Sequence, residues 1–235
     1  MIITPRNTAE LFEPPLHGNQ GNREPAALLS APLGVTVAIS REAGARGGSI
    51  ARRLGKRLGW QVYTQELLEF LSGNESARAH VLADVPPDAA GWVDGQVARL
   101  RDEQIVSAGG EIDEMPRLIL TLAARGRVIL IGRGAGYLLP RESSLHVRVF
   151  APIEDRIAYM SQLLRRTRDE AAEQVRDRDE QRAEFLVKTY NRRTGDLHDY
   201  HMVLNSFLLG EETCADLVLL AIRARERLLN KSEDD

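Results

Sequence analysis

The sequence predicts an α/β protein with a doubly wound, mostly parallel sheet and helices on both of its faces. Apolar segments of strand length alternate along the chain with amphipathic segments of helix length. One interior segment, 127–131, carries a continuous Val-Ile-Leu-Ile run, which is typical of a strand buried on both faces. The first apolar segment, 35–40, runs directly into a glycine-rich turn and then a helix, an arrangement that binds anions.

The first 33 residues are expected to form a tail without fixed structure. They hold five prolines and show no sustained apolar periodicity, and one short helical piece is expected near Thr8–Phe12. Ordered structure begins with a strand over Val35–Ser40. After the glycine turn, a helix from Ile50 to Leu58 presents apolar residues on one face, as a helix lying on a sheet does, and Gly59 closes it.

The segment that follows is less regular. Trp60–Tyr63 predicts a short strand and Gln65–Ser72 a helix. Residues 73–95 contain Pro86-Pro87 and three glycines, so we expect an irregular segment there. Such a segment either covers a substrate or forms a surface loop with one helical turn, and the sequence leaves both open.

The second half restores the alternation of strands and helices. Pro152 suits the first turn of a helix, and Thr167 with Glu170 forms a capping box. The expected elements are a helix over Arg117–Ala124, strands over Arg127–Ile131 and Leu145–Ala151, a helix after Pro152, a long helix from Thr167 to about Tyr190, a strand over Tyr200–Leu204 and a closing helix over Glu212–Leu229. Residues 230–235 are expected to form a charged tail.

The composition argues against several classes of protein. The chain has 235 residues, 43% of them apolar, which fits one domain with a substantial core. A net charge of −3 argues against general nucleic-acid binding. No apolar run approaches the roughly 18 residues of a membrane-spanning helix, and the first residues lack a basic region followed by an apolar one. A single cysteine, Cys214, suits a reducing compartment, so we expect a cytoplasmic protein and leave its oligomeric state open.

The glycine turn is the first candidate for a binding site. Glycines let backbone N–H groups converge on an anion, and the helix N-terminus adds partial positive charge. Ser49 stands where a phosphate loop places the hydroxyl that binds Mg²⁺, whereas Gly48 stands where such a loop carries lysine. We therefore assign phosphate binding to Gly44, Ala45, Gly47, Gly48 and Ser49, with Ser49 also facing the metal. A tight turn that binds nothing is the alternative.

The missing lysine needs a substitute cation. Arg41 and Arg46 flank the turn, and either could supply the charge. A unit charge about 4 Å from a phosphate contributes roughly 4 kcal/mol at an effective dielectric constant of 20. Lys56 is a poor candidate, because it lies seven residues after Ser49, about 10 Å further along the helix.

Two further groups of arginines stand at places where ligands bind. Arg133 directly follows the buried strand, at the sheet edge where α/β proteins hold their ligands. Arg178 and Arg182 are four residues apart on one helix face, where like charges repel unless something neutralises them. A phosphate would do so, but so would Asp179, Glu180 or water, and Arg133 could equally face solvent.

Histidines, metal-binding patterns and tryptophans give weaker indications of a functional site. His146 lies inside a predicted strand and is expected to be packed rather than catalytic. His198 and His201 have no serine or cysteine partner at a telling spacing, and no cluster has the spacing of a metal site. Trp60 and Trp92 are interpreted as packing residues.

Three segments together resemble the cytidylate kinase-like family, a branch of the nucleoside monophosphate kinases. The stretch 39–59 is similar to the Ser-Arg-Glu-x-Gly-x-Gly-Gly opening of that branch. Gly132-Arg133-Gly134 stands where these kinases carry Gly-Arg-Asp, and Asp179-x-x-Arg182 resembles their lid pattern. The resemblance covers about residues 35–225.

The resemblance implies a kinase domain over residues 34–229, with an acceptor-binding insert at 73–115 and a lid at 165–195. It also implies ATP and Mg²⁺ as cofactors and small-molecule nucleotides as partners. Arg178 and Arg182, with Arg41 or Arg46, would be catalytic, and Arg133 and Asp179 would bind the acceptor.

Two functions remain in view at this point. The first is ATP-dependent phosphoryl transfer to a nucleoside monophosphate, with a CMP-like acceptor implied by the resemblance. The second is a catalytically weak nucleotide-binding or regulatory protein that keeps the kinase fold, because losing one phosphate donor typically costs ~10²–10³ in rate.

Overall fold

The computed structural model describes residues 32–83, 85, 89–106 and 114–232. At its centre lies a five-stranded, all-parallel sheet with the strand order β2-β3-β1-β4-β5. The strands are β1 (Thr36–Arg41), β2 (Gln61–Tyr63), β3 (Val128–Ile131), β4 (Ser144–Phe150) and β5 (Met202–Asn205). The predicted α/β class and parallel sheet are confirmed. The predicted helical piece at Thr8–Phe12, and the tail around it, lie outside the described residues.

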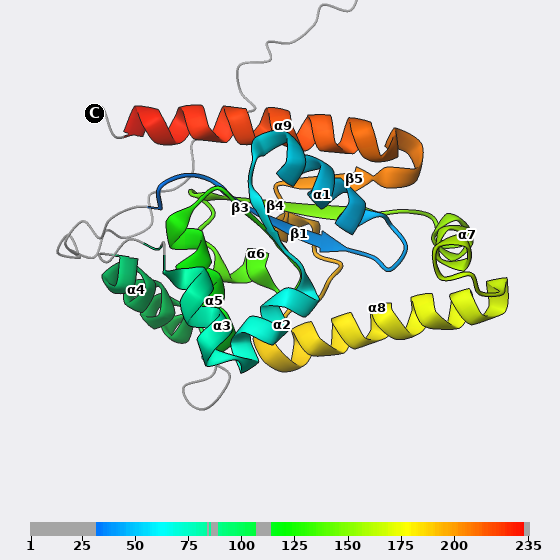
Figure 1. Ribbon diagram of the computed structural model, residues 1–235, viewed down its shortest axis with the longest axis horizontal. Coiled ribbons are helices and arrows are strands. Elements are labelled where there is room, and N and C mark those ends of the chain that lie inside the picture. The colour runs from blue at the N-terminus through cyan, green and yellow to red at the C-terminus, as the bar shows by residue number, and fades with distance from the viewer. Residues whose placement is uncertain (1–31, 84, 86–88, 107–113, 233–235) are drawn as a thin grey trace, which may run out of the picture.

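Helices cover both faces of the sheet (Figure 1). On one face lie α1 (Gly47–Leu58) and α9 (Ser206–Ser232). In the described part of the chain, the opposite face carries α2 (Gln65–Gly73), α5 (Glu114–Arg125) and α6 (Ala135–Leu138), and α4 (Ala89–Asp102) packs against α5. Gly210 is non-helical (φ 76°, ψ 163°) and separates a first turn of α9 from the main helix. That helix continues to Ser232, so residues 230–232 of the predicted tail are helical, and 233–235 lie outside the described residues.

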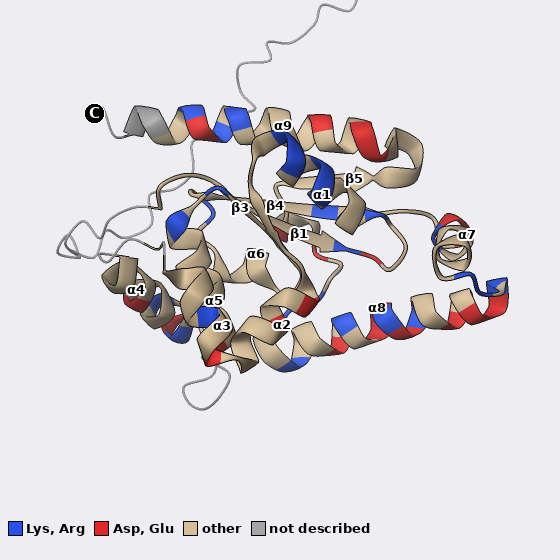
Figure 2. Ribbon diagram, in the orientation of Figure 1, with Lys and Arg blue, Asp and Glu red and all other residues tan. Residues whose placement is uncertain are grey.

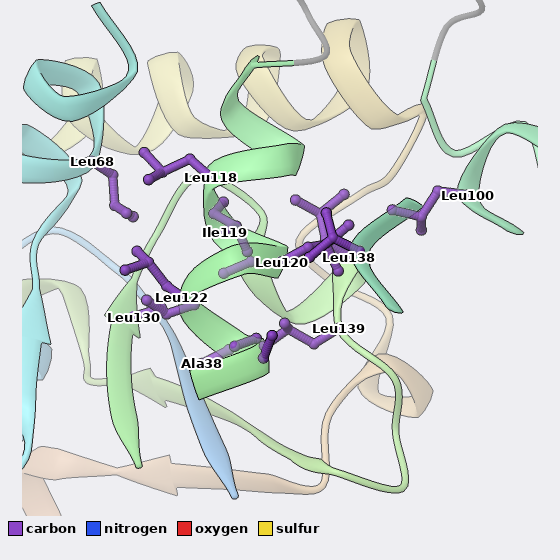
Figure 3. Close-up of a cluster of buried hydrophobic side chains, with 14 of the residues drawn as sticks. Ala38, Leu68, Leu100, Leu118, Ile119, Leu120, Leu122, Leu130, Leu138 and Leu139 are labelled. Atoms are coloured by element: carbon purple, nitrogen blue, oxygen red, sulfur yellow. The ribbon is translucent and has the colours of Figure 1, made fainter. Parts of the chain in front are cut away.

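Strand β3 shows why a continuous apolar run predicts a strand that is buried on both faces. Ile129 and Ile131 pack toward α1 and α9, whereas Leu130 packs toward α5. Figure 3 shows Leu130 beside Ala38 of β1 and Leu122 of α5. Successive strand residues point to opposite faces, so a strand covered on both faces must be apolar throughout.

The segment at 73–95 differs from the prediction of an irregular segment. It contains α3 (Glu75–Leu82) and the first half of α4. The side chain of Asn74 caps α3 by accepting the Ala77 N–H at 2.9 Å. Trp92 is 5% exposed and belongs to the core that α4 shares with α5. Burial of one apolar face therefore outweighs the low helix propensity of the glycines in α4.

Two helices that pack against each other follow β4. They are α7 (Ile153–Leu164) and α8 (Arg168–Tyr190), and the predicted capping box of Thr167 and Glu170 begins α8. Helix α8 extends from α7 to α2 (Figure 1). Within the described part of the chain, no helix is long and apolar enough to cross a membrane.

Candidate functional site

A cavity of about 430 Å³ lies where the carboxyl ends of β1, β3 and β4 face α8. Loops that follow parallel strands gather at one sheet edge, so residues far apart in sequence meet there. Among the described residues that line the cavity, five are arginines and three are carboxylates. The arginines are Arg41, Arg133, Arg148, Arg178 and Arg182. The cavity therefore brings together most of the predicted catalytic and acceptor-binding residues.

Arg41 points from the end of β1 into this cavity. Its Nη2 donates to Gln65 Oε1 of α2 at 3.0 Å. A Cβ atom at Gly132 would collide with the Arg41 guanidinium, so the glycine makes room for it. Burial, together with the nearby guanidinium of Arg182, lowers the pKa of Arg41 to about 10. Arg41 is still charged at neutral pH.

Arg133 sits in a tight turn after β3. It has a left-handed backbone conformation (φ 51°) between two glycines in the same region. Its guanidinium lies 4.4 Å above the ring of Phe185 and forms an ion pair with Glu69. The Nε atom of Arg133 is buried without a hydrogen-bond partner among the described residues. Burial lowers the pKa of Arg133.

Helix α8 carries the other two predicted arginines. The Nη1 of Arg182 lies 3.4 Å from Asp179 Oδ1, and burial lowers the pKa of Arg182. Arg178 lines the cavity and forms no ion pair with a carboxylate of the described residues. Both guanidinium groups thus line the cavity, but only Arg178 does so without a carboxylate partner among the described residues.

Asp179 fastens α8 to the loop after β1. Its Oδ1 accepts the N–H of Ala43 at 2.7 Å, and its Oδ2 pairs with Nη1 of Arg156 at 2.5 Å. Arg156 is 9% exposed and also donates to the carbonyl oxygens of Ala43 and Ala151. Asp179 was predicted to bind the acceptor, but here both of its oxygens hold the loop and α7 together.

The glycine turn presents several unused backbone donors. Among the described residues, no acceptor is found for the amides of Gly44, Arg46, Gly47 and Gly48. The amide of Ala45 donates to Glu42 O at 3.2 Å, so this predicted phosphate ligand is engaged within the turn. Free amides at the start of α1 are a cradle for phosphate oxygens.

The two glycines before Ser49 differ in the space around them. A Cβ at Gly47 would lie 2.7 Å from Cβ of Arg41, which no real structure accommodates without a shift. A Cβ at Gly48 would meet Nη1 of Arg52 at 3.6 Å, an ordinary contact. Gly47 is therefore required by packing, whereas Gly48 is not.

The two predicted substitutes for the loop lysine lie in different surroundings. Arg41 points into the cavity, as described above. Arg46 lies 4.7 Å above the ring of Tyr159 and 3.7 Å from Glu211 of α9, and it does not line the cavity. A third arginine, Arg52, donates from Nη2 to Ser49 Oγ at 3.2 Å. Its position four residues after Gly48 is the sequence feature that could have revealed it.

Comparison with known proteins identifies the family. A sequence model described as the cytidylate kinase-like family matches residues 36–207, from β1 to the first turn of α9. The chain belongs to the cytidylate kinase-like family. The matched range includes the glycine turn, Arg133 and the α7–α8 pair. No protein with a curated description matches the chain significantly.

One solved structure shares the fold of this chain. An uncharacterized protein from Eubacterium ventriosum is 16% identical, with a TM-score of 0.59, over 80% of this chain and 98% of that one. A shikimate kinase from Acinetobacter baumannii, in complex with shikimate, is 15% identical over 85% and 97% of the two chains, with a TM-score of 0.44. The first likeness shows the fold alone, and the second adds nothing to it.

One departure from the family pattern has a packing reason. Gly134 stands in place of the aspartate of Gly-Arg-Asp and has φ 67°. A Cβ atom there would collide with the ring of Tyr190. The hydroxyl of Tyr190 donates to Arg133 O at 3.1 Å, so α8 closes over the turn that carries Arg133.

Sequence reasoning missed Arg148, a polar residue of this cytidylate kinase-like site, and expected His146 to be packed. Arg148 of β4 donates to Ser40 Oγ at 3.2 Å and lies 3.4 Å from Glu42. His146, one alternation earlier, is 3% exposed, and burial lowers its pKa to about 4, so it is packed and neutral at pH 7. An arginine inside a mostly apolar strand was the sequence feature that pointed to Arg148.

Proposed function

We propose that this kinase-like protein transfers the γ-phosphoryl group of ATP to a nucleoside monophosphate, or a similar small phosphate ester, bound in the arginine-lined cavity. An oxygen of the acceptor phosphate forms the new P–O bond, and the bond to the ADP oxygen breaks. Such transfer needs positioning and charge neutralisation rather than a covalent intermediate.

The excess of guanidinium groups in the cavity carries this proposal. Of the three lining carboxylates, Glu42 and Asp179 already pair with Arg156, which lies outside the cavity lining. Glu66 is the main counter-charge to Arg41, and Arg182 is opposed by Asp179 and then by Glu66. A phosphate monoester carries about −1.5 to −2 charges at pH 7 and would neutralise this surplus. The volume of about 430 Å³ lies in the range of small-molecule sites.

The donor would bind at the neighbouring glycine turn. The free amides of Gly44, Gly47 and Gly48 would hold its phosphates, and Arg178 and Arg182 would meet the transferred group from α8. Mg²⁺ fits here only together with the nucleotide, because the described residues hold no group of three or more His, Cys, Asp or Glu that could bind a metal. Ser49 would contribute one oxygen, and the ion would neutralise phosphate charge.

A panel of nucleoside monophosphates, with CMP first, tests the proposal through ADP release. We expect release with at least one acceptor. Arg182→Ala should lower the rate by ~10³–10⁵, the range for an arginine that stabilises the transferred phosphoryl group. Arg176→Ala, on an exposed position of the same helix, is the matched control and should keep its rate. Residual activity of Arg182→Ala above roughly a tenth of wild type contradicts this role.

The second candidate is a nucleotide-binding protein with little or no transfer activity. Gly48 favours it, because this position lacks the lysine of a standard phosphate loop. ATP binding in a calorimeter without ADP release for any monophosphate would support this candidate over the first.

A further inference from the structure

We propose that Arg52 supplies the positive charge that the glycine turn lacks at Gly48, and that it binds the phosphates of the donor nucleotide. This inference rests on the proposed function, because it concerns the donor side of the same site. It assigns the charge to a residue within α1 rather than to Arg41 or Arg46.

The helix geometry brings the guanidinium to the right place. Arg52 follows Gly48 by four residues, so both lie on one face of α1. Side chains of a helix lean toward its N-terminus, and Arg52 therefore extends back over the first turn. Its Nη2 donates to Ser49 Oγ at 3.2 Å, and its Nη1 lies 3.6 Å from the Cβ position of Gly48. A guanidinium thus occupies the space beside the one position where a lysine side chain is missing.

Other described cations near the turn are engaged elsewhere. Arg53 and Arg57 pair with carboxylates of α9, where Figure 2 shows basic residues of α1 beside the acidic start of α9. Arg46 lies beside Glu211, and Arg41 lies on Gln65 in the cavity. Arg52 makes no ion pair with any carboxylate in the described part of the chain, and its side chain is exposed. It is a cation without a counter-charge, next to amides without acceptors.

The contact with Ser49 is weak enough to be replaced. A guanidinium donates more strongly to a phosphate oxygen than to a neutral hydroxyl, because both partners are then charged. An arriving phosphate would therefore draw Arg52 from Ser49 Oγ and free that oxygen. Arginine also offers several donors in one plane, which suits phosphate better than a single ammonium group does.

Binding measurements on the full chain test this assignment without relying on turnover. Calorimetry with ATP and with inorganic triphosphate, each with and without Mg²⁺, gives the affinity of the donor site. Arg52→Ala should weaken both ligands by roughly 10- to 100-fold, the loss expected for a hydrogen bond to a charged group. Lys56→Ala is the matched control, because Lys56 is exposed on the same helix face one turn further from the loop.

A rescue experiment makes the test specific. Gly48→Lys in the Arg52→Ala background should recover most of the lost affinity, since Gly48 has room for a side chain. Circular dichroism of each variant verifies that α1 still folds.

The outcomes separate this inference from the proposed function. If Arg52→Ala binds triphosphate as wild type does, or if Lys56→Ala weakens binding equally, the assignment of Arg52 is wrong, while ADP release by wild type would still support the kinase. If Arg52→Ala and its rescue behave as expected but no acceptor yields ADP, the role of Arg52 in donor binding is supported and the proposed phosphoryl transfer is wrong. A wild type that binds neither ligand overturns both.

Discussion

The neighbouring glycines of the turn, Gly47 and Gly48, should respond to alanine in opposite directions. At Gly47 the added methyl would lie 2.7 Å from Cβ and 3.1 Å from Cγ of Arg41. The Cβ of Arg41 is fixed by β1 and cannot rotate away. At Gly48 the same methyl would meet the movable end of Arg52 at 3.6 Å.

The contacts of the added methyl group determine how much each alanine changes the stability. Forcing one methyl group into a packed position typically costs about 1–3 kcal/mol of unfolding free energy. For a chain of this length, 1 kcal/mol corresponds to roughly 2–4 °C in Tm, so Gly47→Ala should lower Tm by roughly 2–12 °C. Gly48→Ala removes a flexible residue from a helix and should add roughly 0.5–1 kcal/mol, or about 1–4 °C.

Thermal unfolding followed by circular dichroism at 222 nm, an α-helix band, would measure both variants under one set of conditions (~0.15 M salt). The prediction concerns the sign of each change in Tm and which variant is less stable, not the absolute Tm. Equal losses for the two variants, or a larger loss for Gly48→Ala, would show that the packing of Arg41 against Gly47 is not what fixes this turn.

Three further predictions concern other parts of the site. His146 is neutral in the folded chain, with its pKa lowered to about 4 by burial, so the unfolded chain binds more protons between about pH 6.5 and 4. Folding stability should therefore fall by ~3 kcal/mol as pH drops through that window. Denaturant titrations should show a flatter pH dependence of stability for His146→Gln. The control His198→Gln, at an exposed histidine, should keep the pH dependence of the wild type. Asp179→Ala removes the anchors of α8 on the loop, and hydrogen exchange should speed up in α7 and α8 while α5 keeps its protection. Gly134→Asp, which restores the family residue, should lower stability by at least ~1–2 kcal/mol, because the position is left-handed and lies against Tyr190; an unchanged midpoint in guanidinium would contradict this.

The sequence predicted the elements of this fold wherever one local pattern was strong. The apolar run of β3 and the capping box of α8 were placed within a residue or two, whereas the helix after the glycine turn begins at Gly47, three residues before the predicted Ile50. It failed at 73–95, because the glycines and the two prolines outweighed the apolar positions of α4 in the local pattern. Those positions, Trp92 among them, become decisive only once α5 is present to cover them.

The candidate site was predictable in position but not in detail. Arg133 and the α8 arginines were chosen because they follow a strand or share a helix face, and both properties are local. A substitute for the loop lysine was sought at Arg41, Arg46 and Lys56, and Arg52, which we propose, was not considered. Arg52 lies one helical turn away, and only the conformation of its side chain shows that it points back to Ser49.

By itself, the sequence determined the parallel sheet, the glycine turn before α1 and the family, since each depends on residue types at short and regular spacing. The tertiary structure alone decided where the guanidinium groups point. Those long side chains rotate about several bonds, and the partners that fix them are remote in sequence. Asp179 and Ala43 are 136 residues apart, yet their hydrogen bond sets α8 over the loop.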